Sequence, residues 1–134
     1  MTGRRFTRLA LAASMLAAWS AAGQAQQVRD DEAVARGKAK YEHTCAPCHG
    51  RGAGDDGRVM LPGTAALAIK YRGELPPALE DRQGLTADTI RAFVRNGSFS
   101  MPPFRPTELT DREIDDIAAY LAVSSSAAAA GSQR

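Results

Sequence analysis

The chain has 134 residues, with 17 basic and 15 acidic residues and a formal net charge of +2. This length predicts one small domain, and the near balance of charge excludes the basic surface typical of a nucleic-acid-binding protein. Aromatic residues make up only 6% of the chain, and domains this small often depend on a disulfide, a metal or a cofactor for stability.

The first 25 residues have the layout of a secretory signal. Three arginines precede an apolar run over residues 9–22, and small residues follow up to Ala25. This pattern predicts a cleaved signal peptide over residues 1–25 and a periplasmic protein. The run is shorter than the about 20 apolar residues that a membrane span needs. We therefore expect membrane anchoring only if the signal stays uncleaved.

Removal of the signal leaves 109 of the 134 residues. The signal holds three of the basic residues and none of the acidic ones, so the net charge changes from +2 to −1. The remaining chain is predicted to form one domain over residues 26–123. A tail rich in Ser, Ala and Gly follows over residues 124–134, and we expect it to be disordered.

The first predicted helix runs from Asp30 to about Thr44. Three acidic residues, at positions 30–32, lie at the positive end of its dipole. Gly37 falls inside this helix, where glycine costs about 1 kcal/mol relative to alanine. We interpret it as a point of close approach by another helix.

The middle of the chain is predicted to be mostly irregular. Residues 50–63 are rich in Gly, Asp and Pro and indicate a loop. A short helix is expected over residues 64–71, closed by Gly73, and a brief turn over residues 78–82.

Two further helices have clear end signals. Thr86 is placed to cap a helix that Gly97 ends, and Leu85 and Ile90 are spaced as a hydrophobic staple. After an irregular, proline-rich segment over residues 98–107, Thr110 to Glu113 form a capping box. The last helix is expected to end near Val123. No alternating pattern predicts strands, so the fold class is all-α.

The sequence Cys45-Ala46-Pro47-Cys48-His49 contains both cysteines of the chain. A redox dithiol is one interpretation, but such motifs usually follow a strand. A disulfide across three positions closes a small loop and stabilises little. A zinc site is a further interpretation, since four residues could be ligands: His43, Cys45, Cys48 and His49. However, zinc modules take their ligands from two distant segments.

The same pattern is the attachment motif of c-type haem. Cys45 and Cys48 would form thioethers to the two vinyl groups, and His49 would be the proximal iron ligand. The predicted export fits this interpretation, because such attachment takes place outside the cytoplasm.

The distal ligand is a choice between Met60 and Met101. Met60 follows the motif closely, whereas Met101 lies in a loop stiffened by Pro102 and Pro103. Because methionine is flexible, a thioether ligand needs such support. We predict that Met101 is the distal ligand; the alternative is a core methionine that fills a gap.

With these features the chain resembles a class I c-type cytochrome over residues 30–122. The resemblance implies a small all-α fold with one haem, in which the N- and C-terminal helices cross. It implies that Gly37 packs against Tyr120 or Leu121. It also implies that the Pro62 carbonyl accepts a hydrogen bond from His49 and fixes its tautomer.

A narrower likeness is that of "VRNGSFSMPPF". This stretch is similar to the small cytochrome subunits of flavin-dependent dehydrogenases of the 4-cresol type, and related cytochromes serve quinoprotein dehydrogenases. It implies an electron-transfer protein, not itself an enzyme, that accepts electrons from a dehydrogenase and passes them to a cytochrome or oxidase. Two alternatives stay open: a tightly bound subunit of a dehydrogenase complex, or an open-site haem enzyme or gas sensor.

Four other residues carry weaker predictions. His43 cannot reach the opposite haem face and is expected to be a solvated surface histidine. Arg82, Arg95 and Arg105 either pair with haem propionates, since guanidinium suits carboxylates, or are solvated.

Overall fold

The computed structural model describes residue 24 and residues 26–132. The chain divides into two compact units after Glu32. In the first unit, the described residues are helical. The predicted cleavage site at Ala25 and nearly all of the predicted signal lie outside the described residues. Within the described part, no helix is both long enough and apolar enough to cross a membrane.

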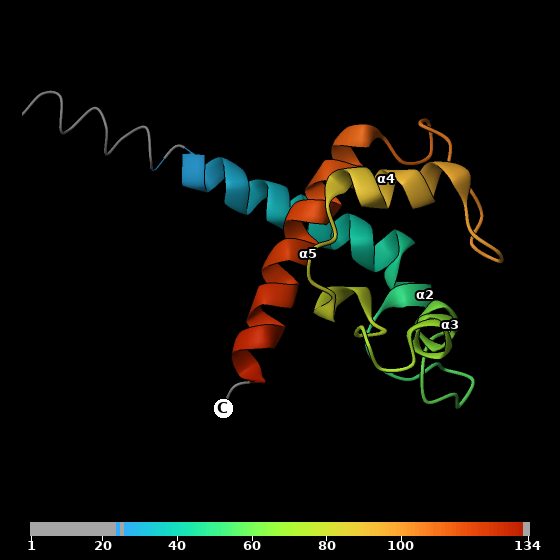
Figure 1. Cartoon of the computed structure of the whole chain (residues 1–134). Coiled ribbons are helices and arrows are strands. Elements are labelled where there is room, and N and C mark those ends of the chain that lie inside the picture. The colour runs from blue at the N-terminus through green and yellow to red at the C-terminus, as the bar shows by residue number, and fades with distance from the viewer. Residues whose placement is uncertain (1–23, 25, 133–134) are drawn as a thin grey trace, which may run out of the picture. The chain divides into compact units, whose positions relative to one another are not determined.

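The second unit is built from helices joined by loops (Figure 1). Residues 33–44 are helical, and five short or long helical elements follow: α2 (Ala46–His49), α3 (Pro62–Tyr71), η1 (Leu79–Asp81), α4 (Ala87–Asn96) and α5 (Asp111–Gly131). The described residues contain no β-strand, only a single bridge between Ser98 and Met101. The predicted all-α class is therefore confirmed.

Both predicted helix caps are present. The Thr86 side chain accepts a hydrogen bond from the Thr89 N–H at 3.2 Å, and Gly97 ends α4 with a φ of 69°. At the start of α5, the Glu113 N–H donates to the Thr110 hydroxyl, while the Glu113 carboxylate accepts from the Thr110 N–H at 2.8 Å. These local bonds fix the starts of α4 and α5 independently of the rest of the fold.

The start of α3 differs from the prediction by two residues. The helix begins at Pro62, not residue 64. Proline suits the first helical position because its fixed φ is already helical and its missing N–H would have no partner there. Arg72 then ends the helix in the left-handed region, with a φ of 47°.

The predicted end of the last helix was wrong. α5 continues past Val123 to Gly131, so residues 124–131 are helical and not a disordered tail. Ser125 is buried with 4% of its surface exposed, and the Ser124 hydroxyl accepts a hydrogen bond from Arg51 at 3.2 Å. These two contacts, together with the high helix propensity of the alanines that follow, extend the helix.

The first and last helices of the second unit cross at Gly37. A Cβ atom on Gly37 would overlap the carbonyl oxygen of Asp116 and lie 2.9 Å from the Ile117 nitrogen. The predicted partner, Tyr120 or Leu121, was therefore wrong by one turn: Gly37 meets the backbone of α5, and this is why its side of the helix must lack a side chain. Tyr120 instead packs against Tyr41, with ring centroids 5.4 Å apart.

The core of the unit lies around this crossing. Six hydrophobic residues with at most 3% of their surface exposed form one cluster: Tyr41, Val94, Leu109, Ile114, Ile117 and Leu121. α5 supplies three of the six, and it packs against both α4 and η1. The cluster therefore ties the long last helix to the first helix through Tyr41, and to α4 and η1.

Candidate cofactor site

The Cys-x-x-Cys-His segment forms one short helical turn. Cys45 is the residue before α2, and the N–H groups of Cys48 and His49 donate to its carbonyl at 3.1 and 2.8 Å. Positions three apart on a helical turn are neighbours on one side. Both cysteines are free thiols; Cys45 is half-buried and Cys48 exposed. Burial and, next, the neighbouring Cys48 raise the pKa of Cys45 to about 11.

The His49 imidazole has a ring nitrogen without a hydrogen-bond partner in the described part of the chain. Its Nδ1 is buried and has no hydrogen-bond partner among the described residues. Burial and, secondarily, the positive charge of Arg82 lower the pKa of His49. The ring is therefore held neutral, which leaves a nitrogen lone pair able to bind a metal.

Gly63 makes room for that imidazole. A Cβ on Gly63 would lie 2.6 Å from Cε1 and 2.7 Å from Nδ1 of His49, and 2.9 Å from the Cys48 carbonyl oxygen. Pro62, beside it, is exposed and begins α3. No hydrogen bond joins Nδ1 to Pro62 in the described structure, so the role of Pro62 as its acceptor stays a prediction.

Three polar side chains brace the turn from behind. The Tyr41 hydroxyl donates to the Glu80 carboxylate at 2.9 Å and lies 3.2 Å from the His49 carbonyl oxygen. The Thr64 hydroxyl donates to the Gly50 carbonyl at 2.9 Å. Burial and the bond to Glu80 raise the pKa of Tyr41, so it stays a donor. Sequence reasoning missed Glu80 and Thr64, because neither belongs to a motif.

The loop that carries Met101 is held by backbone bonds. Ser98 and Met101 exchange two hydrogen bonds of 3.0 and 2.9 Å, and the Phe104 N–H donates to the Val94 carbonyl at 2.7 Å. The Arg95 guanidinium donates to the carbonyls of Phe104 and Leu109. Met101 therefore sits in a defined loop, as its two prolines predicted.

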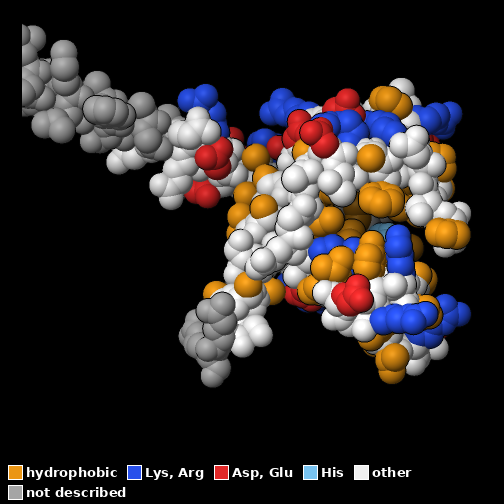
Figure 2. Space-filling model, viewed as in Figure 1, with side chains coloured by type: hydrophobic (Ala, Val, Ile, Leu, Met, Phe, Trp, Pro, Cys, Tyr) orange, Lys and Arg blue, Asp and Glu red, His pale blue; other side chains and the backbone are white. Residues whose placement is uncertain are grey.

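Met101 and the cysteine turn pack against the same core cluster. Met101, Cys45 and Ala46 are partly buried residues in contact with it. Met60, the other candidate ligand, is exposed on the loop that leaves the turn. On the face drawn in Figure 2, the surface is hollowed between α4 and the region of α3, with hydrophobic side chains on its walls and a histidine within it.

The donor set fits a haem better than zinc. No group of three or more His, Cys, Asp or Glu side chains that could hold a metal occurs in the described part of the chain. The two free thiols, the neutral imidazole and the supported thioether match the attachment and ligation of haem c. The assignment of Cys45, Cys48, His49 and Met101 to these roles stays a prediction.

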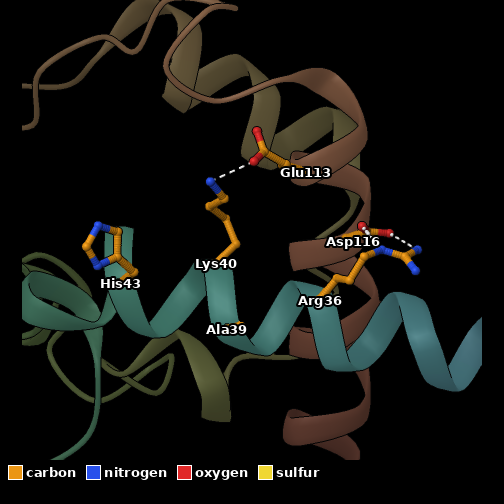
Figure 3. Close-up of a pocket in the computed structure, with 6 residues that line it drawn as sticks. All are labelled: Arg36, Ala39, Lys40, His43, Glu113 and Asp116. Atoms are coloured by element: carbon orange, nitrogen blue, oxygen red, sulfur yellow. Dashed lines mark hydrogen bonds and ion pairs between the residues drawn. The ribbon is translucent and has the colours of Figure 1, made fainter.

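His43 lies outside this arrangement. It is exposed, as predicted, and with Ala39 it lines a groove of about 380 Å³. Two ion pairs border the groove (Figure 3): Arg36 with Asp116 at 2.8 Å, and Lys40 with Glu113 at 2.6 Å. Both pairs join the first helix to α5, so this groove belongs to the helix crossing.

The all-α fold and the Cys-x-x-Cys-His turn define a class I c-type cytochrome, a haem-binding, iron-containing electron-transfer protein. Residues 32–121 match the family model described as cytochrome c oxidase, cbb3-type, subunit III, and the chain belongs to this family. No significant match was found among curated proteins or among solved structures. The predicted similarity to dehydrogenase subunits stays a prediction.

Proposed function

We propose that the protein is a periplasmic single-electron carrier with one covalently bound haem c. The observation that carries this proposal is the α2 turn, which presents two free thiols three positions apart and, directly after them, the half-buried His49 imidazole. One Cys-x-x-Cys-His motif occurs in the chain, which supports a single haem.

Each candidate site residue has a distinct role. Cys45 and Cys48 would hold the haem through thioethers, and His49 and Met101 would bind its iron. In the haem-loaded protein, the Pro62 carbonyl would orient the His49 ring by accepting its Nδ1–H, a bond that is not formed in the described structure. When bound, the haem supplies an iron that changes between the ferrous and ferric states, and His/Met ligation raises its potential relative to bis-nitrogen sites.

The bracing around both ligands suits this role. Tyr41 and Thr64 hold the His49 turn, and Arg95 holds the Met101 loop. Because neither segment needs to move when an electron is gained or lost, little reorganisation accompanies each transfer. If Met101 binds the iron, no open position would remain for a substrate, as expected of a carrier and not of an enzyme.

The Met101 loop also offers a contact surface. Phe99 is fully exposed and has a φ of 51°, a backbone region that bulky residues rarely adopt. An exposed aromatic side chain beside the ligand loop suits a small, transient redox contact. We propose that the donor is a dehydrogenase and the acceptor a cytochrome or oxidase.

The haem assignment is tested by expressing the chain with haem-maturation machinery. We expect a pigment that survives acid-acetone extraction in the wild type and in Met60→Ala, and that is extracted from the Cys45→Ser/Cys48→Ser variant. A colourless, zinc-containing wild type would overturn the proposal.

The carrier role is tested on the purified pigment by redox titration and by addition of cyanide. We expect a reversible one-electron transition and slow cyanide binding. Rapid cyanide binding to the wild type would favour the open-site enzyme or gas sensor. A flavoprotein or quinoprotein that co-purifies in constant ratio would favour the tightly bound subunit of a dehydrogenase complex. An oxidase that co-purifies would instead favour a subunit of the complex that the family description names.

A further inference from the structure

Arg82 is the only Lys or Arg side chain that is buried in the described part of the second unit. It follows η1, and 8% of its surface is exposed. Its Nε and Nη2 donate to the Pro76 carbonyl at 3.1 and 2.9 Å, and its guanidinium lies 4.5 Å from the centre of the Tyr71 ring. The side chain is therefore fixed in one direction by two independent contacts.

This buried charge lacks an acidic partner. No Asp or Glu lies within ion-pair distance of Arg82 among the residues that the structure describes, and Nη1 makes no hydrogen bond to any of them. The nearby Glu80 is bonded to Tyr41 instead. Because burial of an unpaired charge is costly, the geometry indicates a site that receives an anion.

The other two arginines that suited a propionate already have acidic partners. Arg95 pairs with Asp111 at 2.6 Å, and Arg105 pairs with Glu108 at 3.2 Å. Arg105 is also largely exposed, with 79% of its side-chain surface accessible. Of the three arginines that the sequence offered as propionate partners, the structure therefore favours Arg82.

We propose that Arg82 binds a propionate carboxylate of the haem and holds a positive charge beside the iron. This inference rests on the proposed function. Guanidinium offers paired donors that match a carboxylate, and the Nη1 edge is still available. A fixed positive charge stabilises the less positive ferrous state, so Arg82 raises the potential of the site.

The test compares Arg82→Gln with Arg82→Lys and with the control Arg105→Gln, which removes the same charge from the exposed surface. The readouts are the midpoint potential and the propionate bending vibration in resonance Raman spectra. We expect Arg82→Gln to lower the potential and shift the vibration, Arg82→Lys to retain most of the potential, and Arg105→Gln to change neither.

A second measurement needs no variant. In the diamagnetic ferrous wild type, a nuclear Overhauser effect is expected between the Arg82 guanidinium protons and the propionate methylene protons. Its absence, or an unchanged vibration in haem-loaded Arg82→Gln, would overturn this inference alone. A wild type without attached haem would overturn the proposed function as well.

Discussion

The helix crossing and the cysteine turn differ in whether their residues are packed and paired by other parts of the protein. At the crossing, Gly37 meets the α5 backbone, and Ile114 and Ile117 have at most 1% of their surface exposed. At the turn, Cys48 is exposed and His49 keeps a buried nitrogen without a partner among the described residues.

The charges of the two regions differ in the same way. Around the crossing, Arg36 and Lys40 each pair with an acid of α5. Near the turn, the buried Arg82 has no acidic partner in the described structure. The crossing is complete as protein alone, whereas near the turn a buried nitrogen and a buried positive charge lack protein partners of the expected kind among the described residues. Packing therefore identifies the scaffold, and polar groups without protein partners identify the site.

Gly37→Ala gives the largest expected change at the crossing. Its Cβ would overlap the Asp116 carbonyl, and backbone on both sides cannot yield easily. Overpacking of this kind costs about 3 kcal/mol. Chemical denaturation of the haem-loaded protein measures it.

The matched control is Gly131→Ala, near the end of α5, where a Cβ meets nothing within 4 Å. That variant should be neutral or slightly more stable. Equal effects at the two glycines would contradict the close approach of the helices.

Gly63→Ala is the corresponding change at the turn. The new Cβ would lie 2.6 Å from the His49 ring, which can tilt, and 2.9 Å from the Cys48 carbonyl oxygen, which must shift slightly. We expect a smaller loss of stability, about 1–2 kcal/mol, with a changed midpoint potential. Ala66→Ser, on the exposed side of α3, should change neither. A midpoint potential identical to that of the wild type would show that Gly63 does not position the His49 ring.

These two glycines show what the sequence can and cannot predict. The attachment motif, the Thr86 cap and the Thr110 capping box are local, so spacing alone predicts them. Gly37 was recognised as a contact point, but its partner depends on the crossing geometry. The burial of Arg82 and the role of Gly63 depend on the packing of distant segments.

The prediction of a disordered tail after residue 123 was wrong for a different reason. The composition of residues 124–131 is typical of a disordered tail, and the contacts of Ser124 and Ser125 that stabilise them are tertiary. Only the fold brings Arg51 to Ser124.

Thr110→Ala removes the cap of the helix that both regions share. Loss of such a cap costs about 1 kcal/mol, measured by chemical denaturation at neutral pH. Thr107→Ala, in the exposed segment before it, is the control and should have little effect.

Glu113→Gln tests the same helix start through pH. Bonds from Lys40 and Thr110 lower the pKa of Glu113 from 4.5 to about 2. The contribution of a depressed carboxylate is full above 4.5 and is lost as pH falls towards 2. Stability of the variant should therefore fall less steeply between pH 5 and pH 3 than that of the wild type, an interval set by this pKa shift. Glu74→Gln, which removes an exposed carboxylate without an ion pair among the described residues, should not flatten the curve.

Phe99→Asn should have the smallest effect on stability. Asparagine adopts positive φ more readily than phenylalanine, so we expect a gain of about 0.5 kcal/mol together with slower electron transfer to the partner. Phe93→Asn, an exposed aromatic within α4, should bring no gain. Faster or unchanged electron transfer in Phe99→Asn would show that Phe99 does not contact the redox partner.

In the function proposed above, His49 and Met101 bind the iron of one haem attached at Cys45 and Cys48. The far-red absorption band of the ferric protein, which reports a methionine–iron bond, tests it most directly in the wild type, Met60→Ala and Met101→Ala. We predict the band in the first two proteins and its loss in Met101→Ala. A wild type without the band, or a Met101→Ala variant that keeps it, would contradict this assignment of the iron ligands.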